Sequence, residues 1–309
     1  MDRNTVSWQG PMPAIVTPFD DQGRIEPALF RRNIELLIDR GATGVVVGGC
    51  TGEFWALDMS ERRQLFELGV AAVAGRGTVI AGTGAIRRKD AITLTKQAQD
   101  AGCDGALILP PYFVKLTDDE IFSHYEAIAR AVAFPIMLYN IPGNAVNGLS
   151  PALVRHLADL DPIVAVKESS GDWNNYYATA TAVSDRLRVF CGPSSLFGVA
   201  ATLLGADGLI DCFPNMWAPG GLDLFFKARD GDLEESRKLQ AIGAALTHLF
   251  TSEGRTLYPA TKAAMHLLGL PGGTLRPPLR PLDRDQMHGL RIGLEGLGML
   301  DKGQADAAE

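Results

Sequence analysis

One lysine of this sequence is distinguished by its position. Lys167 directly follows the apolar run 163–166, whereas the other lysines fall in predicted helices, in a loop or in the C-terminal tail. Burial at the end of a parallel strand disfavours the ammonium form, which lowers the pKa of the amine and leaves it nucleophilic. Such an amine is suited to forming a Schiff base with a carbonyl substrate. The alternative is a structural ion pair, with Glu168 or Asp211 as the partner.

Two further groups suit carbonyl chemistry. Tyr139 ends the preceding apolar run, so its phenol could carry protons during imine formation; the alternative is a core tyrosine whose hydroxyl reaches water. The segment 50–53 (Cys-Thr-Gly-Glu) lies at a strand-to-helix turn. Its backbone N–H groups and the Thr51 hydroxyl could hold a carboxylate, because helix N-termini favour anions. The same segment also fits an ordinary helix start.

Short apolar runs alternate with stretches of helical period along the chain. Runs that are apolar on both faces and separated by helices are typical of a parallel sheet covered by helices. Eight βα units in about 230 residues favour a (β/α)₈ TIM barrel over an open doubly wound sheet. The strands are predicted to begin near residues 14, 44, 78, 105, 135, 163, 188 and 207.

A glycine-flanked joint recurs at 41–44, 102–105 and 205–208. Glycine accepts positive φ after a helix, so each joint is predicted to end a helix and open a strand. We expect residues 1–230 to form the catalytic barrel and residues 231–309 a C-terminal helical extension with a frayed tail. The three helices of the extension are predicted at 232–251, 258–269 and 283–297.

The active site of a barrel lies at the C-terminal ends of its strands. All histidines fall away from these ends, which argues against a metal cluster and a Ser-His-Asp triad. The chain has neither a complete dinucleotide fingerprint nor a phosphate-binding P-loop. We therefore expect carbonyl chemistry without a cofactor or a metal.

The composition narrows the class of protein further. The chain has 36 acidic and 29 basic residues, a net charge of -7 and no basic run, which argues against a nucleic acid or an anionic membrane as partner. No apolar stretch reaches the ~18–20 residues of a membrane span. The first residues lack a signal-peptide pattern, and the 4 cysteines form no disulfide or zinc pattern. A cytoplasmic enzyme is expected.

The spacing of several motifs resembles the dihydrodipicolinate synthase / N-acetylneuraminate lyase family. These motifs are Gly49-x-Thr51-Gly52-Glu53, Tyr139-Asn140-Ile141-Pro142 and Val166-Lys167-Glu168-Ser169-Ser170-Gly171-Asp172, with support from residues 13–19 and 110–112. The resemblance covers nearly the whole chain. It implies a barrel with a C-terminal helical extension, usually a homotetramer, and an imine between the lysine and pyruvate or another 2-oxo acid. It assigns Lys167 as the Schiff-base lysine, Tyr139 as the acid/base, and Cys50 and Thr51 as the binders of the 2-oxo carboxylate.

Departures from the family pattern separate this chain from a true dihydrodipicolinate synthase. The synthase branch has Thr in place of Cys50 and a second Tyr in place of Phe113, which together form its proton relay. Asn144 replaces an Arg that binds a substrate carboxylate, and a neutral amide cannot make that charge-assisted contact. The lyase branch has acidic residues where this chain has Pro193 and Ser194.

We expect a lyase, either an aldolase or a dehydratase, that acts on a small hydroxylated 2-oxo acid and yields pyruvate or a 2-oxo acid. One alternative is a deaminase of a cyclic imine such as 4-hydroxy-pyrroline-2-carboxylate; another is a non-catalytic sensor or scaffold.

The position of Asp211 leaves three possibilities open. It is predicted to line the far wall of the substrate pocket, to pair with Lys167, or to end its strand in solvent. The predicted substrate-binding residues are Cys50, Thr51, Gly52, Phe113, Asn144, Ser169, Ser194 and Asp211. The far wall of the pocket is predicted to consist of Phe113, Gly143, Asn144, Asn147, Ser194 and Asp211.

Overall fold

A computed structural model describes residues 1–301 of the chain. Its eight strands form one parallel sheet in the order β1-β8-β7-β6-β5-β4-β3-β2, and a bridge between Ala14 and Val46 joins the two edges. The sheet therefore closes into a barrel, which confirms the predicted fold. The strands are β1 (Gly10–Pro11), β2 (Gly44–Val47), β3 (Thr78–Gly82), β4 (Gly105–Ile108), β5 (Ile136–Asn140), β6 (Ile163–Glu168), β7 (Arg188–Cys191) and β8 (Gly208–Leu209).

The first strand differs from its predicted start near residue 14. Gly10, Met12 and Ala14 donate their N–H groups toward β8 and the segment after it, at 2.8–2.9 Å. The intervening residues face β2, but Pro11 and Pro13 have no N–H to donate. Only their carbonyls accept bonds there, at 3.0 and 2.9 Å. The ladder on the β2 side is therefore reduced to the single bridge.

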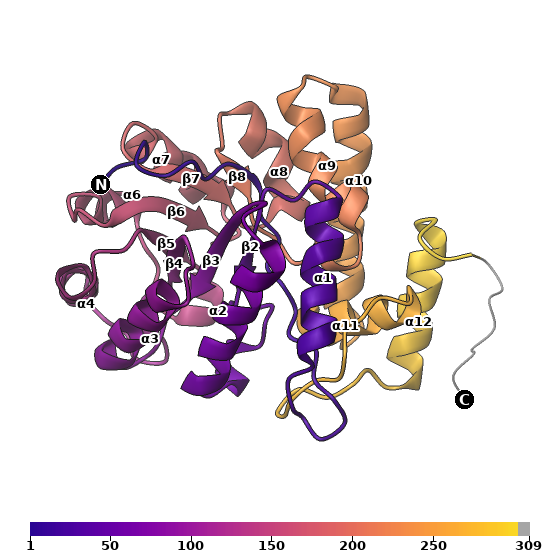
Figure 1. Cartoon of the computed structure of the whole chain (residues 1–309). Coiled ribbons are helices and arrows are strands. Elements are labelled where there is room, and N and C mark those ends of the chain that lie inside the picture. The colour runs from indigo at the N-terminus through magenta and orange to yellow at the C-terminus, as the bar shows by residue number, and fades with distance from the viewer. Residues whose placement is uncertain (302–309) are drawn as a thin grey trace.

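Helices surround the barrel, and α10, α11 and α12 gather at one side of it (Figure 1). The helices are α1 (Pro27–Asp39), α2 (Met59–Val73), α3 (Arg88–Asp100), α4 (Asp118–Ala131), α5 (Pro142–Ala145), α6 (Pro151–Leu157), α7 (Trp173–Val183), α8 (Ser194–Leu203), α9 (Ala218–Arg229), α10 (Leu233–Thr251), α11 (Leu257–Leu267) and α12 (Arg284–Gly296), with short 3₁₀ turns at Phe54–Ala56 and Phe213–Asn215. The last three helices agree with the predicted ones to within two residues. The predicted frayed tail lies outside the described residues beyond Asp301.

The repeated glycine joint has the predicted conformation. Gly41, Gly102 and Gly205 follow α1, α3 and α8 with φ values of +99°, +86° and +90°. Each turns the chain into the next strand, as expected for a helix C-terminus that needs the left-handed region. The joint thus explains how one βα unit repeats around the barrel.

Alternating residues of the strands build two hydrophobic layers. Val45 and Val47 of β2 pack outward into the cluster shared with the helices, whereas Val46 points into the barrel. Phe190 of β7 belongs to the same interior cluster. The interior is therefore filled by side chains, and substrates can bind only where this packing stops, at the ends of the strands.

A buried ion pair attaches the C-terminal helices to the ends of the strands. Lys262 of α11 and Glu53, which follows β2, are 4% and 0% exposed, and their side chains are 2.5 Å apart. Lys262 also donates to the carbonyls of Thr17 and Thr274, at 2.7 and 2.6 Å. The turn after β2 is thus held in place by a helix that lies far along the chain.

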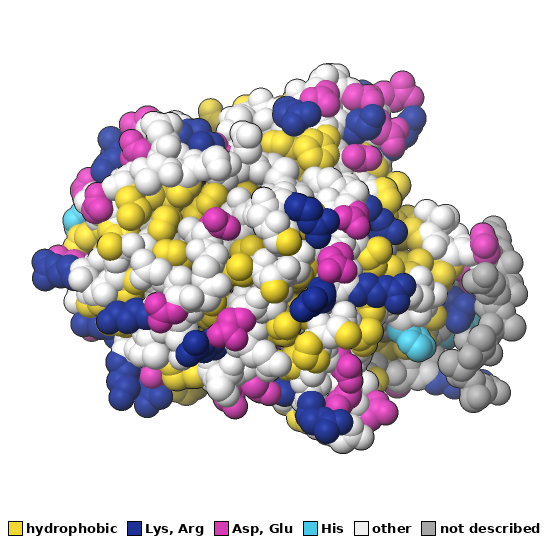
Figure 2. Space-filling model, viewed as in Figure 1, with side chains coloured by type: hydrophobic (Ala, Val, Ile, Leu, Met, Phe, Trp, Pro, Cys, Tyr) yellow, Lys and Arg dark blue, Asp and Glu magenta, His cyan; other side chains and the backbone are white. Residues whose placement is uncertain are grey.

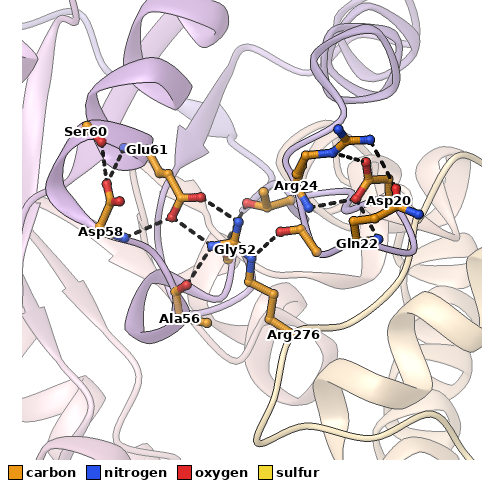
Figure 3. A network of polar contacts seen from close by, with 11 residues as sticks. Asp20, Gln22, Arg24, Gly52, Ala56, Asp58, Ser60, Glu61 and Arg276 are labelled. Carbon is orange, nitrogen blue, oxygen red and sulfur yellow. Dashed lines mark hydrogen bonds and ion pairs between the residues drawn. The ribbon is translucent and has the colours of Figure 1, made fainter.

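Arg276 makes a second attachment of the same kind (Figure 3). Its guanidinium binds both carboxylate oxygens of Glu61 on α2, at 2.5 and 2.7 Å. It also donates to the carbonyls of Ala56 and Gly23, at 2.8 and 2.7 Å. The connection between α11 and α12 is therefore fixed to the loops that follow β1 and β2.

Charged side chains of both signs are interspersed over the face shown in Figure 2. No helix within residues 1–301 is both long enough and apolar enough to span a membrane.

Candidate active site

A cavity of about 190 Å³ opens at the C-terminal ends of the strands. It brings together six of the predicted site residues: Cys50, Thr51, Tyr139, Lys167, Ser169 and Asp211. Since these residues come from β2, β5, β6 and β8 or the loops behind them, the closure of the barrel is what assembles the pocket.

Lys167 and Tyr139 are direct neighbours in the sheet register. They are only 6% and 5% exposed, and the Lys167 Nζ lies 4.2 Å from the centre of the Tyr139 ring. Burial lowers the pKa of Lys167, and the nearby Cys50 and Asp211 oppose this shift. Burial raises the pKa of Tyr139 well above its ordinary value, and Cys50 acts in the same direction. The site thus shifts the amine towards its neutral form and the phenol towards its protonated form.

The two acidic candidates for an ion pair with Lys167 have other partners. Within residues 1–301, Lys167 lies within ion-pair distance of neither Glu168 nor Asp211. Glu168 is buried and accepts hydrogen bonds from the Asn140 side chain and the Ser170 N–H, at 2.9 and 2.8 Å. Burial raises the pKa of Glu168. The structure therefore leaves the Lys167 amine available to a substrate.

Asp211 lies at the N-terminus of α8 and neither pairs with Lys167 nor ends its strand in open solvent. One carboxylate oxygen accepts from the Ser194 hydroxyl at 2.9 Å and from the Ser195 N–H at 3.0 Å. The other accepts from the Cys212 N–H at 2.6 Å. Asp211 thus lines the pocket as a fixed negative charge.

The turn at 50–53 limits how a carboxylate could be held. Gly52 and Glu53 donate their N–H groups within the turn, each at 3.0 Å, and the Gly52 carbonyl accepts from the Thr17 hydroxyl at 2.8 Å. Gly52 therefore supports the turn and does not line the pocket. Thr51 is the member of this turn with a free hydroxyl at the cavity.

Five of the six residues of the predicted far wall lie outside the cavity lining, among them Gly143, which is exposed on α5. Phe113 is 84% exposed in a loop where its own φ is +79°, and Asn144 is exposed on α5. Ser194 is buried against Asp211. Asn147 is buried after α5, where its side chain accepts from the Leu116 N–H and donates to two backbone carbonyls of the loop after β4. These positions are set by local loop conformation, which strand spacing does not report.

Several pocket residues were not predicted from the sequence. Ser195 begins α8, Thr247 and Thr251 lie on α10, and Tyr258 lies on α11. The Thr247 hydroxyl donates to Ser195 at 2.9 Å. The rule that locates a barrel site at its strand ends cannot find side chains supplied by helices that follow the barrel, and no motif marks these positions.

Within residues 1–301, no group of three His, Cys, Asp or Glu side chains is arranged to hold a metal ion.

The lowered pKa of Lys167 predicts that its amine becomes reactive at a lower pH than an ordinary lysine amine does. An ammonium cannot attack a carbonyl, so a pKa below the usual value of 10.5 moves the onset of amine reactivity to lower pH. Competitive labelling with a trace of an acetylating reagent, quantified for each peptide by mass spectrometry, measures this onset directly. Lys96, exposed on α3, provides the reference in the same sample. Reactivity of Lys167 that still rises tenfold per pH unit between pH 9 and 10 would contradict the prediction.

Comparison with known proteins agrees with this geometry. The model of the dihydrodipicolinate synthetase family matches residues 7–295, and the chain belongs to this family. It is 35% identical to an uncharacterised DapA-like lyase of Rhizobium meliloti, with 95% of this chain and 97% of that protein covered. It is 36% identical to the 4-hydroxy-tetrahydrodipicolinate synthase of Syntrophobacter fumaroxidans, with coverage of 95% and 100%.

Solved structures of family members show the same fold. Dihydrodipicolinate synthase of Acinetobacter baumannii, solved with pyruvate, matches with a TM-score of 0.88 at 33% identity, covering 94% of this chain and 99% of that one. A prophage protein of the family from Escherichia coli K12, also in complex with pyruvate, matches with a TM-score of 0.90 at 27% identity, with coverage of 96% and 100%. The chain therefore has the fold of a Schiff-base lyase.

Proposed function

We propose that this protein is a lysine-dependent lyase, an aldolase or a dehydratase, that acts on a small hydroxylated 2-oxo acid and releases pyruvate or another 2-oxo acid. The observation that carries the proposal is the buried Lys167 amine, unpaired with its acidic neighbours and lying over the Tyr139 ring at the pocket. Pyruvate is bound by two of the solved family members, which supports a 2-oxo acid here.

The proposed reaction begins with attack of the Lys167 amine on the C2 carbonyl carbon. The carbinolamine that forms loses its hydroxyl as water when Tyr139 donates a proton, and the nitrogen lone pair forms the C=N bond. Thr51 holds the carboxylate of the substrate. In an aldolase, the resulting iminium takes up the electron pair of the C3–C4 bond, which leaves the enamine of the 2-oxo acid product and frees the other fragment as a carbonyl compound once its C4 hydroxyl loses a proton. In a dehydratase, the Tyr139 phenolate removes a proton from C3, and the enamine that forms expels the C4 hydroxyl, which leaves as water with that proton.

The lining of the cavity supports a hydroxylated substrate with one carboxylate. Ser195, Thr247 and Thr251 supply hydroxyl groups beyond the strand ends. Among residues 1–301, Lys167 is the only Lys, Arg or His side chain of the lining, and Asp211 adds a negative charge. A second carboxylate would find no cation there and would face Asp211. Hydroxyl groups can both donate and accept, as a hydroxylated chain requires.

We further propose that the chain forms a homotetramer. Large apolar side chains remain exposed in loops and turns of the single chain, with Trp55, Phe113 and Val146 exposed by 38%, 84% and 55%. Exposed apolar groups of this size are typical of interaction surfaces.

Trapping with borohydride tests the proposed function. Incubation with pyruvate, and separately with hydroxylated 2-oxo monoacids and diacids, should yield a reduced adduct on Lys167 alone, read by intact-protein and peptide mass spectrometry. The monoacids should be turned over at least about tenfold more efficiently than diacids of equal length, because the far wall has no cation. Assays for ammonia separate this reaction from the deaminase. Absence of an adduct with every compound would refute the proposal.

A further inference from the structure

Arg62 is a buried cation that has no carboxylate beside it. It lies on α2 and is 5% exposed. Its terminal nitrogens donate to the carbonyls of Gly84, at 3.1 Å, and Gly82, whereas its buried Nε has no hydrogen-bond partner among residues 1–301. No acidic side chain in this part of the chain lies within ion-pair distance of Arg62. Since buried charges are ordinarily paired, an ion pair does not explain the position of this arginine.

Arg62 and the reacting tyrosine line one small cavity. The cavity has a volume of about 10 Å³, which is room for about one water molecule. Cys50 and Tyr139 line both this cavity and the pocket, whereas Lys167 lines only the pocket and Arg62 only the small cavity. Tyr139 and Cys50 therefore lie between two basic side chains, Lys167 towards the substrate and Arg62 behind.

The surroundings of the Arg62 guanidinium preserve its charge. Burial lowers the pKa of Arg62 to about 10, so the group stays protonated at neutral pH. The titratable side chains that face it are Cys50, after β2, and Tyr112, in the loop after β4, with Tyr139 across the cavity. Burial raises the pKa of all three, so none of them carries a negative charge. The ring of Phe54 lies 5.3 Å from the guanidinium, and its packing leaves the cation without a counter-charge.

We propose that Arg62 is a positioning residue that acts through Tyr139: its positive charge stabilises the phenolate that Tyr139 becomes when it gives up its proton. The inference rests on the proposed function. Burial alone opposes an ionised phenol, and a nearby cation favours it. When this phenolate takes a proton from C3 of the iminium, the C3–H electron pair forms the C2=C3 bond. The electron pair of the C=N bond returns to the Lys167 nitrogen, so an iminium and a phenolate become an enamine and a phenol.

Two variants of Arg62 separate its charge from its hydrogen bonds. Arg62→Gln is neutral and Arg62→Lys is cationic, and both can donate to a backbone carbonyl. We expect Arg62→Gln to lower kcat about 10- to 100-fold, with KM changed by less than about threefold, because a nearby charge shifts a pKa by about 1–3 units. Arg62→Lys should recover most of this loss and remain within about threefold of the wild type.

Exchange of the C3 hydrogens of pyruvate in deuterium oxide, followed by proton NMR, measures the step that needs the phenolate. Arg62→Gln should slow this exchange by the same factor as kcat. The yield of the borohydride adduct on Lys167 at saturating pyruvate should stay that of the wild type, because the amine is unchanged.

Arg188→Gln is the matched control for lost hydrogen bonds. Arg188 begins β7, at the opposite end of the barrel from the pocket. It donates to the carbonyls of Arg3 and Val6, at 3.0 Å each, and pairs with Asp207 at 2.8 Å. Its replacement should lower the thermal midpoint, since buried acceptors lose their donor, and should leave kcat and the exchange rate unchanged.

A double-variant cycle with Tyr139→Phe tests whether Arg62 acts through the phenol. Without a phenol there is no phenolate to stabilise, so adding Arg62→Gln to Tyr139→Phe should slow the reaction by no more than about twofold. Losses that multiply, equal losses in Arg62→Gln and Arg62→Lys, or wild-type exchange in Arg62→Gln would overturn the role of Arg62. Absence of an adduct on Lys167 in the wild type would instead overturn the proposed function.

Discussion

Replacing Lys167 with alanine is expected to reduce kcat by at least about 10⁴-fold and to abolish the borohydride adduct, because no other lysine among residues 1–301 lines the pocket. The fold should survive. The side chain lies at the mouth of the barrel, where the variant removes a buried amine that pairs with neither Glu168 nor Asp211. Steady-state kinetics with the best substrate of the panel, together with adduct mass spectrometry, measure both effects.

Lys96→Ala is the matched control for this variant. Lys96 is exposed on α3, so its loss should leave both turnover and the adduct unchanged. Far-ultraviolet circular dichroism and the thermal midpoint of Lys167→Ala should stay close to those of the wild type. Residual activity of Lys167→Ala within tenfold of the wild type would show that another group is the nucleophile.

Replacing Lys262 with alanine should have the largest effect on stability. The variant leaves the Glu53 carboxylate fully buried, with one remaining hydrogen bond, from the Arg276 N–H at 3.2 Å. It also removes the donor to the carbonyls of Thr17 and Thr274. Breaking a buried ion pair by removing one partner costs about 3–5 kcal/mol. Urea denaturation, followed by circular dichroism and intrinsic fluorescence, measures the loss of unfolding free energy.

Further variants test whether the loss of unfolding free energy in Lys262→Ala comes from the buried charge of Glu53. Lys238→Ala removes exposed ion pairs with Glu234 and Glu235 on α10, which should cost less than about 0.5 kcal/mol. Lys262→Met retains the side-chain length, so it should remain strongly destabilised, and the addition of Glu53→Gln should recover part of the loss. A Lys262→Ala variant within about 1 kcal/mol of the wild type would contradict this account.

The strand ends of the barrel were the predictable part of the site. Because the apolar runs mark the strands, Lys167 and Tyr139 could be placed at the same edge of the sheet, and their neighbouring register follows from the fold. The first strand was predicted less well, since Pro11 and Pro13 remove the donors that a regular ladder needs.

The remainder of the pocket could not be predicted from spacing. Phe113 and Asn144 follow strands closely in the sequence, but both are exposed and neither lines the cavity. Tyr258 and Thr247 lie on helices that follow the barrel and reach the pocket through packing between distant segments. Periodicity reports which face of an element is buried, but not which distant element covers it.

The late position of Tyr258, Lys262 and Arg276 in the chain affects the order in which the site is completed during translation. Lys167 and Tyr139 are synthesised first, whereas α11, which supplies Leu257 and Tyr258 to the same pocket, and the segment that contains Arg276 follow later in the chain. At ~5–20 residues per second, the ribosome needs about 5–20 s to cover this interval. During that time the nascent chain has Lys167 but lacks the side chains that α11 supplies to the pocket. The side-chain lining of the pocket is therefore complete only after Tyr258 has been synthesised, and its attachment to the loops after β1 and β2 only after Arg276.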